Sequence, residues 1–569
     1  MNAEQLLQHF ERISEAPDAI KRLRRFILDL AVRGKLVEQD PSDEPASELL
    51  KRIAAEKARL VKEGLGASRS RKNNKDAAIP YSEKDLEIPS SWTWARLLEL
   101  GHTQTGTSPS SANPGLFGDE IPFIKPGDLD GKEIIYDGPG LSLEGVKQSR
   151  LAPSNTLLMV CIGATLGKVN KTTRPVCFNQ QINSLIPLMG AFTDYLALAL
   201  KSSCFQQLAW SKAGTGTLPI ISKGKWEVLP IPLPPLAEQH RIVAKVDELM
   251  SLCDQLEAAK AEREKCRDSL VAASLQGLNQ PAEEEDTFRE HARFTFNNLP
   301  RITTRPTHIK QLRQTILNLA LRGKLVEQDP SDEPAEEQLA RIMEAKMLHG
   351  RKAKATKRKH AAALDEEDDF HLPTSWATAP LADLVTVLNG RAYKQSELLD
   401  AGTPVLRVGN LFTSNKWYYS DLELDNDKYC DDGDLIFSWS ASFGPFIWNG
   451  GRTIYHYHIW KLPLHSPDDL SRDYLYLYLL DKTAEIKAAG HGISMVHMTK
   501  EKMEKLEVPL PPLAEQQRIV AKVNELMAIC DQLEAQITAT EQDSRRFLES
   551  VLADALAPGI ELREVAEVA

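Results

Sequence analysis

The segment Ile27–Ala46 reads ILDLAVRGKLVEQDPSDEPA, and 289 residues later Ile316–Ala335 reads ILNLALRGKLVEQDPSDEPA, with 18 of 20 positions identical. A second pair of near-copies follows. Pro234–Ala258 reads PPLAEQHRIVAKVDELMSLCDQLEA and Pro511–Ala535 reads PPLAEQQRIVAKVNELMAICDQLEA, with 21 of 25 positions identical. The two pairs of near-copies indicate a tandem duplication, and such an internal repeat decides the architecture of a chain. In each half, two repeated frame segments flank a central segment.

The two central segments hardly match each other. A few anchors survive, including Ser91-Trp92 against Ser375-Trp376, and Pro122–Leu129 against Pro404–Leu411. We therefore expect one fold that carries two different surfaces. The repeated frames would do one shared job twice, and the central segments would do two different jobs.

Composition excludes several classes of protein. The 569 residues are 42% hydrophobic and 26% charged, which is typical of a soluble chain of several domains. The sequence contains no run of about 18 apolar residues, which a membrane-spanning helix would need. The first residues lack the pattern of a signal peptide. Seven scattered cysteines without a C-x-x-C pair favour reduced thiols in a cytoplasmic protein. The net charge of -11 argues, by itself, against a nucleic-acid partner.

A helix is predicted after each PPLAEQ motif, because the proline pair prevents a helix from extending backwards. Apolar residues then recur with a mean spacing of 3.5, which is typical of a coiled coil. The predicted seam consists of Ile242, Val246, Leu249, Cys253 and Leu256 in the first copy, and Ile519, Val523, Leu526, Cys530 and Leu533 in the second. We expect the two helices to pair antiparallel. The alternative is that each helix packs only on its own domain.

The central segments have a mixed texture, with short β-like runs broken by glycine and proline and then a helix. All nine tryptophans fall in them. The predicted fold class is therefore α+β: two α+β domains joined by long helices that form an antiparallel coiled coil, with an internal pseudo-twofold repeat. The predicted domains are a helical frame (1–80), a first domain (81–230), a central helix (231–278), a linker with the second frame (279–365), a second domain (366–508) and a C-terminal helix (509–569). The linker between the two halves is expected at Asn279–Pro306, where an acidic run stands, and Gly34 and Gly323 are expected to end the frame helices.

Motifs for catalysis, metals and cofactors are missing. Gly163–Val169 resembles a phosphate-binding loop, but it has one residue too few between its glycines and lacks the metal-binding hydroxyl. His456 and His458 have no evident third partner for a metal ion. We therefore expect a non-catalytic binder with no cofactor and no metal.

Side chains able to read bases gather at two places. In a strand, Asn179, Gln181 and Asn183 would share one face, and such amides bond adenine in two places at once. His456 and His458 occupy roughly the matching position in the second domain. Further candidates for DNA contacts are Lys125, Lys147, Arg150, Lys168, Lys171, Arg174, Arg391, Tyr393, Lys394, Arg407 and Asn410. The alternatives are a hydrogen-bonded polar strand and ordinary surface charges.

Charge is spread unevenly between the central segments. Residues 92–228 hold 12 Lys or Arg and 10 Asp or Glu, a net of +2, whereas residues 376–508 hold 13 and 18, a net of -5. Neither segment is a polybasic binder. If the ligand is DNA, partner subunits are expected to supply much of the electrostatic attraction.

The repeated frames resemble those of the specificity subunit of type I restriction–modification enzymes. The resemblance rests on LAVRGKLVEQDPSDEPASELLKRI at 30–53 and its copy from 319, on Leu-Pro-x-Ser-Trp at 372–376, and on PPLAEQxRIVAKV at 234–246 and 511–523. The first copy carries Ile88-Pro89 in place of Leu-Pro, a small departure from the motif. The resemblance covers nearly the whole chain.

What the resemblance implies agrees with the residues. Each central domain would recognise one half of a bipartite site on double-stranded DNA, and the paired helices would fix the spacer. The frames would bind two modification subunits, which methylate adenine with S-adenosylmethionine. Restriction subunits, which carry the ATP-driven translocase and nuclease, would join them, and no chemistry is expected in this chain. Two other hypotheses stay open: a stand-alone DNA-binding regulator, and a coiled-coil protein scaffold.

Overall fold

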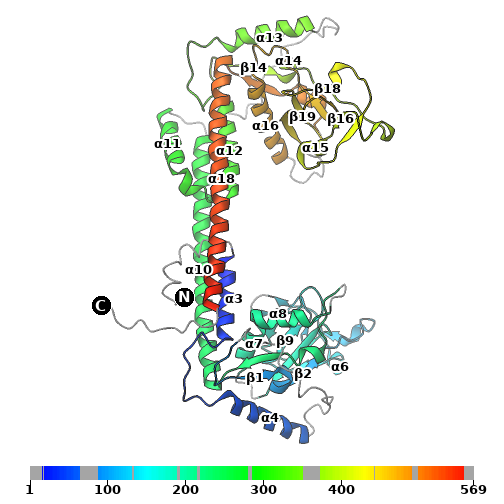
Figure 1. The fold of residues 1–569 in the computed structure, drawn as a ribbon, viewed down its shortest axis with the longest axis vertical. Helices are drawn as coiled ribbons and strands as arrows, with labels where there is room; N and C mark the ends of the chain where they lie inside the picture. The colour runs from blue at the N-terminus through cyan, green and yellow to red at the C-terminus, as the bar shows by residue number, and fades with distance from the viewer. Residues whose placement is uncertain are drawn as a thin grey trace, which may run out of the picture. The chain divides into compact units, whose positions relative to one another are not determined.

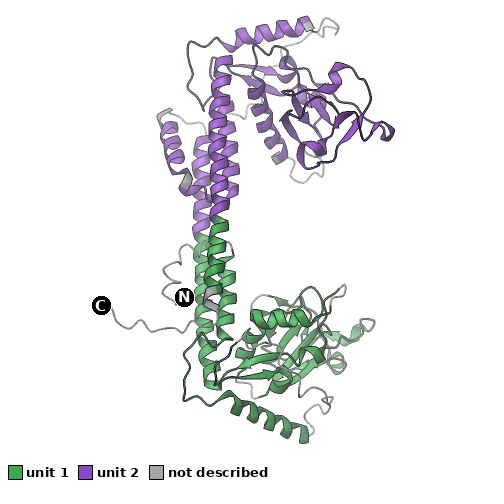
Figure 2. Ribbon diagram, in the orientation of Figure 1, with its two compact units in different colours: residues 1–262, 541–569 green, residues 263–540 purple. Residues whose placement is uncertain are grey.

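The computed structural model describes residues 16, 18–63, 87–130, 133–188, 192–214, 218–279, 285–349, 372–440, 443–489 and 498–556. The chain divides into two compact units (Figure 2): residues 1–262 with 541–569, and residues 263–540. Two helices contribute to both units, α10 (Leu236–Asn279) and α18 (Leu513–Leu556), each of 44 residues. The start of α10 therefore lies in the unit that contains the end of α18, and the reverse holds in the other unit.

Each unit has a frame of helices, which Figure 1 shows beside its central domain. In the first unit these are α3 (Ala19–Ala31) and α4 (Ala46–Lys62). In the second unit they are α11 (Glu285–Ile302), α12 (Pro306–Leu321) and α13 (Ala335–His349). Gly34 and Gly323 follow α3 and α12 with φ of 66° and 67°, which is the left-handed conformation that ends a helix. The helix stops expected at these glycines are confirmed.

Helix α11 corrects one expectation. Asn279–Pro306 was predicted to be a linker between the units, but its residues from 285 to 302 are helical, and Leu299 and Ile302 are buried in the core of the second unit. The acidic run Glu283–Asp286 suggested a solvated linker. The apolar residues that follow it have helical spacing, and burial of that face stabilises the helix.

The first domain is built on two main sheets. One has the strand order β10 (Val169–Lys171), β9 (Leu157–Val160), β12 (Ile182–Pro187), β2 (Gly101–Thr105), with all neighbours antiparallel. The other has the order β4 (Phe123–Ile124), β11 (Val176–Phe178), β8 (Leu151–Ala152), with β4 parallel to β11. Small two-stranded ribbons are β3 (Phe117–Gly118) with β7 (Gly140–Leu141), and β5 (Leu129–Asp130) with β6 (Glu133–Ile134).

The second domain repeats the first sheet in the same order and adds one edge strand to the second. Its first sheet is β20 (Gly444–Ile447), β19 (Leu435–Ser438), β22 (Ile459–Lys461), β15 (Leu388–Asn389). Its second has the order β17 (Tyr418–Ser420), β16 (Thr403–Leu406), β21 (Thr453–Tyr455), β18 (Tyr429–Cys430), with β16 parallel to β21 and β17 as the added strand. Shared strand order with few shared residues confirms one fold that carries two surfaces.

Short helices and a closing ribbon complete each domain. A ribbon of β1 (Thr93–Arg96) with β13 (Pro230–Leu233), or of β14 (Ala377–Pro380) with β23 (Glu507–Leu510), returns the chain to its long helix. The helices are α5 (Leu97–Leu100), α6 (Leu143–Lys147), α7 (Thr193–Lys201), α8 (Ser203–Lys212) and α9 (Lys223–Trp226) in the first domain, and α14 (Leu381–Leu384), α15 (Val408–Phe412), α16 (Arg472–Ala489) and α17 (Lys500–Glu504) in the second.

The predicted seam is largely buried, and it packs against more than one helix. The fully buried members are Ile242, Val246, Cys253, Ile519, Val523 and Cys530. In the first unit they share a core with α3, the central domain and Leu552 of α18; in the second they share one with α10, α11, α12 and the domain. The apolar spacing of 3.5 is thus explained by burial in a mixed core, because the frame helices α3 and α12 occupy part of the seam.

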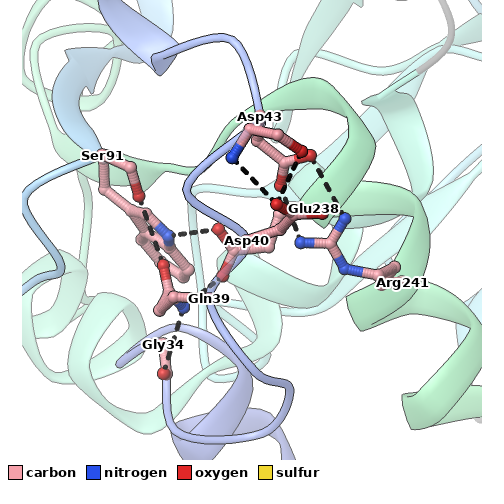
Figure 3. A network of polar contacts seen from close by, with 9 residues as sticks. Gly34, Gln39, Asp40, Asp43, Ser91, Glu238 and Arg241 are labelled. Atoms are coloured by element: carbon pink, nitrogen blue, oxygen red, sulfur yellow. Dashed lines mark hydrogen bonds and ion pairs between the residues drawn. The ribbon is translucent and has the colours of Figure 1, made fainter.

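A buried polar network joins the frame, the central domain and the long helix in the first unit (Figure 3). Glu238, in the first turn of α10, accepts hydrogen bonds from Trp92 Nε1 at 2.9 Å and from Gln39 Nε2 at 2.6 Å. One turn later, Arg241 pairs with Asp43 at 2.7 Å. Burial raises the pKa of Glu238, although its two hydrogen bonds oppose that shift.

The second unit contains the same network with nearly the same distances. Glu515 accepts hydrogen bonds from Trp376 Nε1 at 3.0 Å and from Gln328 Nε2 at 2.5 Å, and Arg518 pairs with Asp332 at 2.7 Å. We call the set of Glu238, Trp92 and Gln39, and its copy in the second unit, the frame latch. Each frame latch ties three segments that are far apart in the sequence to one carboxylate.

Replacing Trp92 with phenylalanine is expected to destabilise the protein by about 1–3 kcal/mol, because it leaves a buried carboxylate with one donor fewer. The measurement is the free energy of unfolding in urea. Trp210→Phe is the matched control, since Trp210 is 44% exposed, and it should change stability by less than about 0.5 kcal/mol. Equal effects of the two substitutions would show that the latch contributes no specific stability.

Candidate nucleic-acid interface

Two tight turns occupy equivalent positions at the ends of the first sheet in the two domains. The first turn is Asn179–Gln181, between β11 and β12, and the second turn is His456–His458, between β21 and β22. In each, the residue after the turn donates its backbone N–H to the first residue of the turn: Ile182 to Asn179 at 3.1 Å, and Ile459 to His456 at 2.9 Å.

A glycine on the neighbouring segment holds each turn at close range. Gly106 N donates to Ile182 O at 3.0 Å, and Gly390 N donates to Ile459 O at 3.2 Å. A Cβ on Gly106 would lie 2.2 Å from Asn179 O, and one on Gly390 would lie 2.4 Å from His456 O. Only glycine allows backbones to approach this closely.

The next backbone contacts also match. Thr107 N donates to Phe178 O at 3.0 Å, and Arg391 N donates to Tyr455 O at 3.1 Å. Cys161 N donates to Gln181 O at 2.8 Å, and Trp439 N donates to His458 O at 3.1 Å. One backbone framework therefore displays different side chains in the two domains. The pairs are Asn179 and His456, Gln180 and Tyr457, Gln181 and His458, and Thr107 and Arg391.

The first turn is neutral and rich in amides. Asn179 Nδ2 donates to Gln181 Oε1 at 3.0 Å, and Ser108 Oγ donates to Gln180 Oε1 at 2.6 Å. Gln180 is exposed. Asn179 is buried, and its Oδ1 also accepts from Gln181 N at 3.1 Å, so its amide orients the turn. The exposed amide of Gln180 suits recognition of base edges.

The second turn is aromatic and lies beside a guanidinium. The Trp439 ring contacts His458 and Tyr457, with centroids at 5.0 and 6.0 Å. Tyr457 is 40% exposed. Arg391 pairs with Glu397 at 2.8 Å. Exposed aromatic faces and an oriented guanidinium can stack on bases or bond them in the grooves.

His456 is neutral at physiological pH. Burial lowers its pKa to about 4, and the neighbouring His458 and Arg407 add to that shift. A neutral imidazole both donates and accepts one hydrogen bond. His456 therefore contributes an uncharged imidazole to the second turn.

The expected strand face at 179–183 is wrong. Asn179, Gln180 and Gln181 form the turn, and the strand starts at Ile182. Asn183 is 2% exposed, accepts a hydrogen bond from Thr105 Oγ1 at 2.7 Å and donates to Cys161 Sγ. It is part of the core, so its predicted base contact has no exposed group to make it. Alternating amides resembled a strand because a turn and an edge strand both favour polar side chains.

Some of the other candidates lie near the second turn, and others belong to the first domain. Arg391 and Tyr393 join the second turn, where the Tyr393 ring stacks on His456 at 6.5 Å. Arg407 lies over the Tyr418 ring, and Arg174 lies over the Tyr136 ring. Several candidates have polar partners: Lys147 pairs with Glu144, Lys171 pairs with Asp194, Lys125 N donates to Asp128, Lys394 N donates to Glu397, and Asn410 Oδ1 accepts from Arg407 N. Arg150 is exposed, and Lys168 lines a pocket with Asn170 and Lys201.

Sequence reasoning missed the middle residue of each turn. Gln180 and Tyr457 are the exposed members, but the strand interpretation placed Gln180 on the opposite face. Trp439 was also missed. Gly106 and Gly390 could have indicated the two turns, since a lone glycine after a strand often marks a close approach between two backbones.

The described residues contain no group of three His, Cys, Asp or Glu placed to hold a metal ion. Among the helices that the structure describes, none has the length and apolarity needed to cross a bilayer. The seven cysteines are free thiols.

A fold built twice, each time with different side chains on the equivalent turn, defines a duplicated subunit with two distinct domains. A family model described as "Type I restriction modification DNA specificity domain" matches residues 89–263 and 373–540. The chain belongs to this family of type I restriction–modification specificity subunits, and as such it is a non-catalytic subunit.

Curated relatives extend over nearly the whole chain. The type I restriction enzyme EcoAI specificity subunit of Escherichia coli is 31% identical over 94% of this chain and 93% of its own length. The EcoEI specificity subunit of Escherichia coli is 30% identical with the same coverage. A solved chain from work described as "Structural basis underlying complex assembly and conformational transition of the type I R-M system" shares the fold, with a TM-score of 0.51, 18% identity, and coverage of 84% of this chain and 100% of that one.

Gly106→Ala and Gly390→Ala are each expected to destabilise the protein by more than about 2 kcal/mol. The added methyl group would force the backbone of the glycine segment away from the backbone of the turn. Gly127→Ala is the control, because a Cβ there meets nothing within 4 Å. Urea unfolding compares the three variants. If Gly106→Ala behaves like Gly127→Ala, the close approach is not needed for the turn.

Stability is expected to depend on the protonation of His456. The unfolded histidine binds a proton near pH 6.5, whereas the folded one does so only near the pKa of about 4. Between these values the unfolded state binds more protons, so the free energy of unfolding falls as pH falls. His456→Phe should remove this part of the pH dependence. Unfolding of both proteins in urea between pH 4 and 7 is the measurement, and identical slopes would contradict the assignment.

Proposed function

We propose that this chain selects the DNA sequence on which a type I restriction–modification complex acts, and that each central domain reads one half of a bipartite site through its turn. The observation that carries the proposal is the repeated backbone framework with different side chains at 179–181 and 456–458. Because the backbone framework is the same in both domains, each turn would approach a DNA duplex in the same orientation. Different side chains then select different bases.

The two turns suit different base chemistry. The amides of Gln180 and Gln181 are suited to adenine, whose N6 and N7 pair with an amide in two hydrogen bonds, and the buried Asn179 orients Gln181. In the second domain, Arg391 is suited to guanine O6 and N7, and the Tyr457 ring to the methyl group of thymine. The two half-sites would therefore differ, and the full site would be asymmetric.

The helical frames support assembly rather than base reading. We propose that the repeated frames bind two modification subunits, that restriction subunits join them, and that α10 and α18 set the length of the spacer between the half-sites. Adenine methylation, translocation and cleavage would reside in those partners. The net charge of -11 fits a subunit whose partners supply much of the attraction to phosphates. We expect the complex to act in the cytoplasm.

Substitution within a turn is expected to relax one half-site only. Gln180→Ala should reduce discrimination in one half of the methylated motif, and Tyr457→Ala in the other, by about tenfold or more at the contacted base pair. The measurement is genome-wide mapping of methylated adenine in cells that express this chain with its cognate modification subunit.

The control for Gln180→Ala is Gln255→Ala, which removes an exposed amide on α10 and should leave both halves unchanged. Absence of a bipartite motif with the wild-type complex would refute the proposed function. A turn substitution that changes both halves equally would refute the assignment of one half-site to each turn.

A further inference from the structure

Two cations gather at one tyrosine in the second domain. Arg407 directly follows β16, and its guanidinium carbon lies over the Tyr418 ring, 5.1 Å from the ring centroid. The Lys416 ammonium lies over the same ring at 5.2 Å. Both basic residues are exposed. Their charged groups therefore lie within about 10 Å of each other, and attraction to a single ring orients both of them.

The pairing of β16 with β17 brings these two cations together. Val405 lies opposite Tyr418 in the antiparallel ladder, and the same register continued by two residues sets Arg407 opposite Lys416. Like charges at facing positions of two antiparallel strands destabilise the pair. The arrangement is therefore unfavourable for the free protein and becomes favourable when an anion lies between the two charges.

The described residues provide no carboxylate within 4.0 Å of the Arg407 guanidinium or the Lys416 ammonium. Other basic residues of this domain are paired with acids at 2.5 to 2.9 Å, namely Arg391, Lys428, Arg452, Lys461 and Arg472. The domain as a whole is acidic. Two adjacent cations without an acidic partner therefore form a local positive site on it.

This positive site adjoins the second turn. The backbone N–H of His456 donates to Leu406 O at 2.9 Å, and Arg407 is the next residue after that acceptor. Burial lowers the pKa of His456, and the charge of Arg407 adds to the shift, so the guanidinium lies close to the imidazole. An anion held by Arg407 would therefore lie beside any duplex that the turn contacts.

The first domain has a single lysine in the place of Arg407. The backbone N–H of Asn179 donates to Ile124 O at 3.1 Å, and the exposed Lys125 follows that acceptor. One basic residue beside the turn is thus common to both domains.

The second cation has no counterpart in the first domain. Ile121 forms an isolated antiparallel bridge with Leu141, whereas Thr403 pairs with Ser420 in the ladder of β16 and β17. The two pairs correspond because Ile121 and Thr403 each precede the first residue of the matched segments. Four residues before Leu141 stands the exposed Asp137, at the place where the second domain has its lysine. The shared fold therefore does not require a cation there, and the acid would repel an anion.

We propose that Arg407 and Lys416, held at the Tyr418 ring, form a site for one phosphate of the DNA backbone and so position the duplex against the second turn. Contacts to phosphates fix the register and orientation of a protein on DNA without reading its sequence. The first domain, with Lys125 alone at the corresponding place, would hold its half-site less firmly. The inference rests on the proposed function, which supplies the DNA.

The double variant Arg407→Met with Lys416→Met tests the site in the full chain assembled with its modification subunit. It should keep or raise the unfolding midpoint, because both residues are exposed and their mutual repulsion is removed. It should weaken DNA binding about tenfold, the size expected for one charge-assisted contact, on all sequences alike. The slope of log affinity against log salt should become shallower by about 0.9.

The matched control removes two other cations of the same domain. Lys500→Met with Lys505→Met deletes two exposed lysines that pair with Glu504 and Glu501, and it should leave affinity and slope unchanged. Equal effects of the two double variants would show that only net charge matters, and would overturn the proposal. Arg407→Lys keeps the charge and should retain most of the affinity.

Duplexes with a single neutral methylphosphonate identify the source of the anion. At one position the replacement should weaken binding by the wild-type chain but have no effect on the Arg407→Met, Lys416→Met variant. Equal losses for both proteins at every position, with an unchanged salt slope, would overturn the proposal. If inorganic phosphate stabilises the wild type but not the variant while DNA affinity is the same, the site takes free anions and the DNA assignment is wrong.

Mapping of methylated adenine separates this site from base reading and from the proposed function. The variant should keep the wild-type motif, because a phosphate contact carries no sequence information. A motif relaxed at one base pair of the second half-site would show that Arg407 or Lys416 reads a base, and the phosphate assignment would fail. A bipartite motif with the wild type would leave the proposed function standing in each of these cases, whereas its absence would refute that function independently.

Discussion

The buried carboxylates of Glu238 and Glu515 are the constraint on which the rest of each unit depends. Each accepts a hydrogen bond from a tryptophan that begins the central domain and another from a glutamine in the loop of the frame. A buried carboxylate that loses a donor is strongly destabilised, so all three segments must meet at one point. Because the carboxylate stands at the start of the long helix, the latch fixes where the central domain joins that helix.

This constraint explains why one part of the sequence repeats and another does not. The latch needs the PPLAEQ motif, the Ser-Trp anchor and the loop glutamine, and these are the residues that both halves share. Ser91 and Ser375 extend the latch by donating to the side-chain oxygens of Gln39 and Gln328. Beyond these contacts the central domain needs only its strand order and the glycine under its turn. The backbone contacts around the turn are the same in both halves although its side chains differ, so the framework tolerates different residues there.

Sequence patterns predicted the features that depend on residues close together in the chain. Apolar spacing predicted the buried seam, left-handed glycines predicted the helix ends, and the duplication predicted two domains of one fold. The turn at 179–181 was not predictable from its own residues, because the contact with Gly106 that shapes it joins positions about 70 residues apart in the sequence.

The net charge of the chain is a poor guide to the charge of a DNA-binding surface, because many charged side chains form ion pairs within the fold. Asp43 and Asp332 neutralise Arg241 and Arg518 beside the latches, where they fix frame geometry rather than the surface potential. The two turns differ in chemistry: the first carries neutral amides, and the second carries aromatic rings beside Arg391, which pairs with Glu397. Under the proposed function, one backbone framework with two different sets of side chains would favour an asymmetric DNA site.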